Sequence, residues 1–178
     1  MKKLMILSGL VAAMSAASMA QAAEGTLNFT GELTAASCQV NATVPGNIAV
    51  DMGQVDFSSL STTTIGMVET PIQFEVNCTD AGGLDMARLT FDASRGSDTN
   101  PNNRQLLALD NTSTGSGVGI ALVGPAGIID LSSATPTITT NLDAGSANFD
   151  LKAGFVLDGT APTAGAVSAT LPFVLSLE

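Results

Sequence analysis

The sequence predicts an all-β protein of one domain, a sandwich of two packed sheets, and three observations point to it. Apolar residues recur at every second position in several short segments, as expected of strands with one buried face. Clusters of Gly, Asn, Asp and Ser separate these segments and predict turns. No window longer than about ten residues has a convincing helical period. Many short strands at regular spacing in a chain of 178 residues are typical of a β-sandwich.

The first 22 residues are predicted to be a cleaved secretory signal. Met1-Lys2-Lys3 is a short basic start, and the residues after it are uncharged and mostly apolar. Ala20-Gln21-Ala22 fits the small-x-small cleavage rule, so residues 23–178 are expected to form the mature protein. A membrane anchor is disfavoured because the stretch is short and rich in Ala, Ser and Gly. No later segment is expected to insert into a membrane.

The composition excludes several classes of function. The chain has no His, so Ser-His-Asp catalysis, Cys-His catalysis and imidazole metal sites are impossible. Its net charge of −10 argues against binding to nucleic acid and to anionic membrane surfaces. The mature segment contains no G-x-S-x-G, Walker or S-x-x-K motif. We therefore expect a protein that is not an enzyme, with no catalytic residues, metal or cofactor.

The two cysteines, Cys38 and Cys78, are expected to form a disulfide. Export would place them in an oxidising compartment, where two cysteines commonly pair. The bridge would close a loop of roughly 40 residues and contribute about 4 kcal/mol by the chain-entropy model. A redox-active pair is disfavoured because there is no C-x-x-C motif and no adjacent cation.

The interior of the chain contains four segments with alternating apolar rows, which predict strands. They are residues 72–78, 88–92, 118–122 and 149–157. Residues 53–65 are ambiguous between strand and helix.

Alternating rows also occur at both ends of the mature chain. Near the N-terminus, Leu27, Phe29, Gly31 and Leu33 share one face of a predicted strand. The last predicted strand, residues 167–177, carries its apolar residues at odd positions and runs almost to the last residue. A terminal strand is an open edge unless something pairs with it. Either both strands pair inside the same sandwich, or they pair with another chain.

Two glycine- or aspartate-rich segments have superficial similarity to ligand sites. Residues 115–119 have the glycine content of a phosphate loop but lead into a strand and not a helix. Residues 98–102 begin like a calcium loop, but the positions that require Gly and Glu hold Asn103 and Leu109. Both segments are interpreted as surface turns.

Taken in order, these segments resemble the subunits of chaperone–usher pili, of the type 1 fimbrial class. The resemblance covers essentially the whole sequence. Gly165 is the fourteenth residue from the end, as in the family, whereas Leu177 stands in place of the family's penultimate Tyr. The other matching segments are residues 29–33, 36–40, 52–55, 74–78 and 118–122.

The resemblance implies an incomplete immunoglobulin-like β-sandwich that lacks its last strand. A donor strand from a chaperone or a neighbouring subunit would complete it. Residues 23–34 would be this protein's own donor strand and residues 35–178 its body. Leu27, Phe29 and Leu33 would fill pockets of the next subunit's groove, and Gly31 would lie where that groove is shallow. The expected groove and chaperone contacts are Gly165, Leu171, Phe173, Leu175, Leu177 and Glu178.

The resemblance also implies a function, that of a major or minor structural subunit of a bacterial surface pilus that supports cell adhesion. Its partners would be a periplasmic chaperone, an outer-membrane usher and neighbouring pilins, and it would pass through the periplasm to the cell surface. The alternative is a secreted carbohydrate-binding or adhesin-like sandwich that is not built into a fibre. The absence of Trp and Tyr disfavours that alternative, because these residues are the usual stacking platforms for sugar rings.

Overall fold

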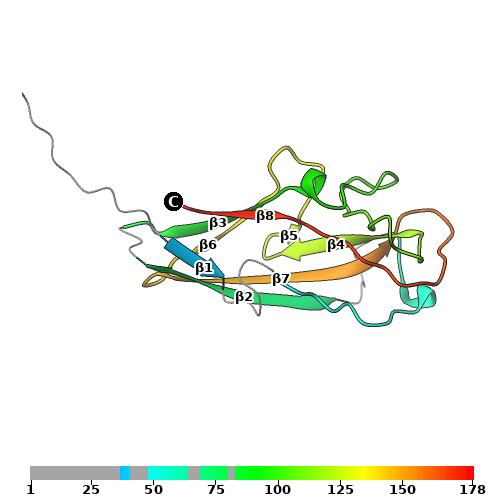
Figure 1. Ribbon diagram of the computed structural model, residues 1–178, viewed down its shortest axis with the longest axis horizontal. Helices are drawn as coiled ribbons and strands as arrows, with labels where there is room; N and C mark the ends of the chain where they lie inside the picture. The colour runs from blue at the N-terminus through cyan, green and yellow to red at the C-terminus, as the bar shows by residue number, and fades with distance from the viewer. Residues whose placement is uncertain (1–36, 41–47, 64–68, 80–82) are drawn as a thin grey trace, which may run out of the picture. The chain divides into compact units, whose positions relative to one another are not determined.

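A computed structural model of the chain describes residues 37–40, 48–63, 69–79 and 83–178 (Figure 1). Contacts between Cα atoms divide the chain into two units, Met1–Leu33 and Thr34–Glu178, and every described residue belongs to the second unit. The predicted signal segment and the predicted donor strand, with Leu27, Phe29, Gly31 and Leu33, lie outside the described residues.

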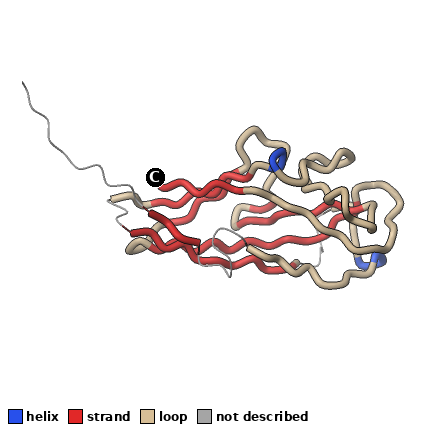
Figure 2. The backbone as a smooth tube through the Cα atoms, in the orientation of Figure 1, coloured by secondary structure: helices blue, strands red, loops and turns tan. Residues whose placement is uncertain are grey.

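The described residues form strands joined by loops, with two single-turn 3₁₀ helices, so the all-β prediction is confirmed (Figure 2). The 3₁₀ helices are Phe57–Ser59 and Ala93–Arg95. The strands are β1 Ser37–Val40, β2 Thr70–Thr79, β3 Met86–Phe91, β4 Val118–Gly124, β5 Gly127–Ile128, β6 Thr137–Asn141, β7 Ser146–Leu157 and β8 Phe173–Leu177.

The strands form two antiparallel sheets. The larger sheet has the order β1-β2-β7-β4-β5, and the smaller has the order β6-β3-β8. The ladder between β2 and β7 is long, running from Thr70 opposite Ala153 to Asn77 opposite Ser146. Cys38 lies opposite Cys78 in the ladder between β1 and β2, and the two form the predicted disulfide.

The main core lies between the two sheets and is built by the predicted alternation. In β2, Phe74 and Val76 point inward, and in β3 every second residue is buried. Phe74 stacks on Phe149 of β7, with 5.3 Å between the ring centroids. A smaller cluster of Leu106, Ala121 and Val156 lies apart from this core.

Three segments differ from the sequence-based prediction. The expected strand 167–177 is a strand only from Phe173 onward. The ambiguous segment 53–65 is irregular in its described part, apart from the turn at Phe57–Ser59. β6, with the sequence TITTN, was not expected, because only one of its residues is strongly apolar. No helix among the described residues is long and apolar enough to cross a membrane.

Candidate functional site

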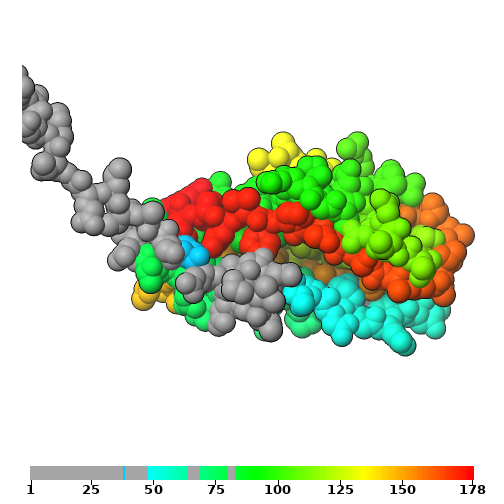
Figure 3. Space-filling model, viewed as in Figure 1, coloured from blue at the N-terminus to red at the C-terminus, as the bar shows by residue number. Residues whose placement is uncertain are grey.

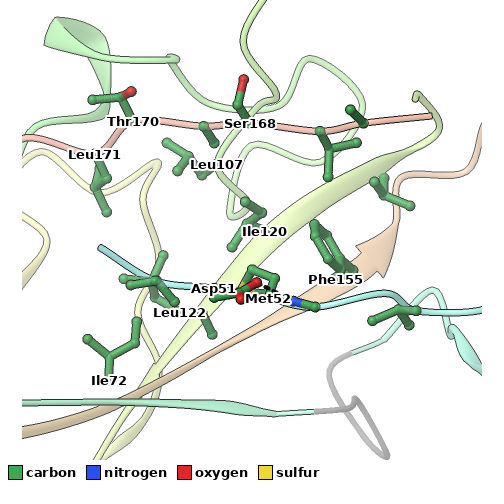
Figure 4. A pocket seen from close by; sticks show the side chains of 18 of the residues that line it. Asp51, Met52, Ile72, Leu107, Ile120, Leu122, Phe155, Ser168, Thr170 and Leu171 are labelled. Carbon is green, nitrogen blue, oxygen red and sulfur yellow. Dashed lines mark hydrogen bonds between the residues drawn. The ribbon is translucent and has the colours of Figure 1, made fainter. Parts of the chain in front are cut away.

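Among the described residues, one long side of the sandwich carries a groove. The groove, of about 1220 Å³, lies between the C-terminal segment, residues 163–173, and an extended segment at residues 48–60. Figure 3 shows these two segments, in red-orange and cyan, on either side of a hollow. Apolar side chains from both sheets, and Leu107 from the loop before β4, line the groove between these walls (Figure 4). Those from the sheets include Ile72, Phe74, Leu89, Ile120, Leu122, Leu151 and Phe155.

The C-terminal wall keeps the predicted alternation from Val167 to Leu171. Val167, Ala169, Leu171 and Phe173 are half-buried, and most of the even-numbered residues between and beyond them are exposed. Figure 4 shows Leu171 pointing into the groove, while the hydroxyls of Ser168 and Thr170 point away from it. The wall therefore turns its apolar row to the groove, where that row is only partly covered.

The backbone of this wall is also open on the groove side. In β8 the even residues pair with β3: Glu178 and Met86 exchange two hydrogen bonds of 2.9 and 3.0 Å, and Asp92 donates to the carbonyl of Pro172. In an antiparallel ladder, the intervening residues direct their N–H and C=O groups to the other edge. Among the described residues, the backbone groups of Val167, Ala169 and Leu171 have no hydrogen-bond partner.

Pro172 falls in the row that faces β3. Its missing N–H therefore removes a bond on that side and leaves the groove edge uninterrupted.

The opposite wall, residues 48–60, is irregular. It bends at Gly53, which has a φ of 64° and donates its N–H to Asp51 Oδ1 at 2.9 Å. Within the described chain, no backbone hydrogen bond ties residues 48–55 to another segment. Asp56 caps the 3₁₀ helix Phe57–Ser59 within this wall and accepts the N–H of Ser58 at 2.8 Å. Hydrogen bonds from the backbone and then the side chain of Ser58 lower the pKa of the Asp56 carboxyl.

The C-terminal residue is fixed to the start of β3. The carbonyl oxygen of Glu178 accepts the N–H groups of Asp85 and Met86, and its side chain accepts a hydrogen bond from Arg88 Nη2 at 2.6 Å. Leu175 and Leu177 are half-buried against the main core and lie outside the residues that line the groove. Of the residues expected to contact a partner strand, Gly165, Leu171 and Phe173 line the groove.

Close packing requires glycine at position 165, which the sequence alone did not reveal. A Cβ atom at this position would overlap the amide nitrogen of Gly115 and the carbonyl carbon of Thr114. The loop before β4 therefore lies directly against the C-terminal segment, and only glycine fits there.

Asn100 and Asn102, in the loop before β4, bind Asp158, which follows β7. Asn100 is 3% exposed and donates to Asp158 Oδ2 at 3.1 Å, while Asn102 donates to the same oxygen at 3.3 Å. Burial opposes ionisation of Asp158, but the hydrogen bonds from Thr160, Asn100 and Asn102 outweigh it and lower the pKa of this carboxyl. No cluster of three or more potential metal ligands occurs in the described part of the chain.

Comparisons with known proteins agree on one family. A family model described as "Fimbrial protein" matches residues 27–178. A type-1 fimbrial protein subunit of Serratia marcescens is 29% identical over 191 residues, and the match covers 100% of both chains.

Two solved structures are similar in fold. One belongs to a chaperone–usher pilus, with a TM-score of 0.59 and 19% identity, covering 88% of this chain and 96% of the other. The other is the P pilus rod subunit PapA, with a TM-score of 0.58 and 20% identity, covering 79% of this chain and 99% of the other.

Proposed function

This chain belongs to the fimbrial protein family, and from that premise we propose that its groove binds a β-strand from another protein. As a member of the family it is a structural subunit that assembles with other pilin subunits into a surface fimbrium. The observation that supports strand binding is an apolar floor flanked by a wall whose backbone groups are unpaired at residues 167, 169 and 171. An added strand would cover the apolar floor with its side chains and pair its backbone with the unpaired N–H and C=O groups of the wall.

The proposed donor is the N-terminal segment of a neighbouring subunit, residues 23–34. Leu27, Phe29 and Leu33 alternate with polar residues, so one face of the segment would cover the floor while its backbone pairs with the open edge. Gly31 would leave space where the groove is shallow. Burying three large apolar side chains at about 2 kcal/mol each, with a row of hydrogen bonds, would overcome the mutual repulsion of acidic subunits.

Before assembly, a periplasmic chaperone would occupy the groove, and an outer-membrane usher would direct the exchange. This part of the proposal requires that residues 1–22 act as an export signal. The carboxylate of Glu178 would be the anchor for basic residues of the chaperone. No enzymatic activity is part of the proposal, which is consistent with a chain that has no His.

Deletion of Ala23–Leu33 tests the proposed donor. The truncated subunit should still form a complex with the chaperone, because its own groove is intact, but should not be added to the groove of another subunit. Gel electrophoresis of unheated assembly reactions should show loss of the polymer ladder.

A matched pair of point variants refines the same experiment. Phe29→Ala should shorten the ladder, while Thr30→Ala, on the opposite face of the same segment, should leave it unchanged. If deletion of the segment instead prevents folding in the presence of the chaperone, the segment belongs to its own sandwich and the proposal is wrong.

A further inference from the structure

The two halves of the C-terminal wall are held in different ways. β8 is bound to β3 by a regular ladder. Residues 166–170 have no such neighbour, and side-chain hydroxyls accept the N–H groups of the even-numbered residues instead. Ala166 donates to Thr114 Oγ1 at 2.9 Å, Ser168 to Ser113 Oγ at 3.0 Å, and Thr170 to Ser97 Oγ at 2.6 Å.

The three hydroxyls come from one loop, residues 96–117, which joins the second 3₁₀ helix to β4. The carbonyl groups of Ala166, Ser168 and Thr170 accept backbone N–H groups from the same loop. Ala166 accepts the N–H of Thr114 at 2.8 Å, Ser168 that of Asp110 at 2.8 Å, and Thr170 that of Ser97 at 2.9 Å. Ser97 Oγ also donates to Asp110 Oδ1, so its orientation is fixed. The loop thus takes the place of a strand along this half of the wall.

Glycines allow the loop and the wall to approach this closely. At Gly96, a Cβ atom would overlap the carbonyl oxygen of Thr170 and lie 2.6 Å from Pro172 Cδ. At Gly115, it would lie 2.9 Å from Val167 Cγ1, and Gly165 is restricted in the same way from the other side. Contacts this close along the whole segment indicate that its position is set by the loop.

We propose that Ser97, Ser113 and Thr114 form a hydroxyl clasp, which holds the wall in line and controls how fast a bound strand leaves the groove. This inference rests on the proposed function. The N–H and C=O groups that would pair with a donor belong to Val167, Ala169 and Leu171. Val167 and Ala169 each lie between two residues held by the clasp, and Leu171 lies between Thr170, which the clasp holds, and Pro172, whose carbonyl accepts the N–H of Asp92. A hydroxyl can rotate away alone, whereas a ladder bond is supported by its neighbours. Loosening the clasp therefore lets this half of the wall move outward and release the donor.

Peptide release tests the clasp directly. The chain 23–178 is refolded with a fluorescent peptide of the sequence Glu24–Ala35, and release is followed after an excess of unlabelled peptide is added. Thr114→Val removes the acceptor at an exposed position with little change of shape, and Ser113→Ala removes the next one. Each should accelerate release about fivefold, as expected for the loss of one hydrogen bond.

Two further variants separate the clasp from general destabilisation. Thr114→Ser keeps the hydroxyl and should release the peptide at the original rate. Ser132→Ala removes a surface hydroxyl that bonds Asp130 at 2.6 Å, far from the clasp in sequence and bonded to none of its residues, and should also have no effect. Amide hydrogen exchange should become faster at Ala166 and Ser168 in the two clasp variants and stay unchanged at Val174 and Ser176.

The outcomes are distinguishable. Equal release rates in Thr114→Val, Ser113→Ala and the original chain would overturn the clasp while leaving strand binding intact. Failure of the peptide to bind the original chain would overturn both the clasp and the proposed strand binding. Faster release in Ser132→Ala as well would show a general loss of stability and would also overturn the clasp.

Discussion

The two sides of the sandwich interior contain similar side chains but differ in how well these are covered. On the closed side, Val76 is 0% and Phe149 is 3% exposed. On the open side, Ile72, Leu171 and Phe173 follow the same alternation, yet they are only half-buried. Alternation in sequence therefore tells which way a side chain points and does not tell whether another strand covers it. The apolar area that stays exposed on the open side is area that a partner strand can still bury.

The largest expected effect comes from closing the open side in cis. The test protein lacks Ala23–Leu33 and carries, after Glu178, a flexible linker and a copy of Glu24–Ala35. Its free energy of unfolding should rise by about 6 kcal/mol, because three apolar side chains are buried at about 2 kcal/mol each. Guanidinium unfolding of the extended and unextended proteins measures the gain.

The control for this protein is Gly31→Leu in the appended copy, which should lose about 1–3 kcal/mol of the gain by overpacking. Equal unfolding midpoints with and without the appended strand would mean that the sandwich is already complete.

The disulfide should act on the closed side alone. Replacing Cys38 and Cys78 together by Ala should lower the free energy of unfolding by about 4 kcal/mol. Because the bridge joins β1 to β2 and does not line the groove, the loss should be the same with and without the appended strand. Denaturant unfolding of the four proteins gives the comparison, and a loss that depends on the appended strand would contradict the separation of the two sides.

A pair of core substitutions should respond differently to the appended strand. Leu171→Ala should lower the free energy of unfolding by less than about 1 kcal/mol in the open subunit, and by about 2 kcal/mol once a strand covers Leu171. Val76→Ala, on the closed side, should cost about 2 kcal/mol in both proteins. If Leu171→Ala costs the same in both, then the added strand does not cover the C-terminal wall.

The smallest expected effect is a pH dependence at Asp158, which binds Asn100 and Asn102. The folded-state pKa of Asp158 is lowered, since hydrogen bonds to the carboxylate outweigh its partial burial. Its contribution to stability is therefore present above its unfolded pKa of about 3.9 and is lost as the pH falls through the lower folded value. Asp158→Asn should reduce the unfolding midpoint near pH 6 and have less effect near pH 3. A constant difference between the two proteins would contradict this role.

Much of the fold could be predicted because it depends on local alternation. β2, β3, β4 and β7 were expected within a few residues of their observed bounds, and their apolar rows form the core. β6 could not be expected, since it contributes only Ile138 to the interior and is defined by its pairing with β3.

The groove was only partly predictable. Its C-terminal wall followed from the apolar row of residues 167–177, but the facing wall at residues 48–60 has no regular period and appears only in three dimensions. The clasp was hidden for a different reason. Serines and threonines are frequent throughout this chain, and nothing local to Ser97 or Thr114 indicates that each would accept an N–H from a residue more than fifty positions away.

The position of the disulfide has a mechanical consequence. If residues 23–34 are held by a neighbouring subunit, a pull along the filament reaches the body at Cys38, and the covalent bond transmits the tension directly to Cys78 in β2. The chain between the two cysteines is bypassed and cannot be extended. β2 is paired with β7 from Thr70 to Asn77, so force along its axis loads these hydrogen bonds together in shear and does not open them one at a time. The bridge would thus allow a subunit to bear tension without unravelling from its N-terminal end.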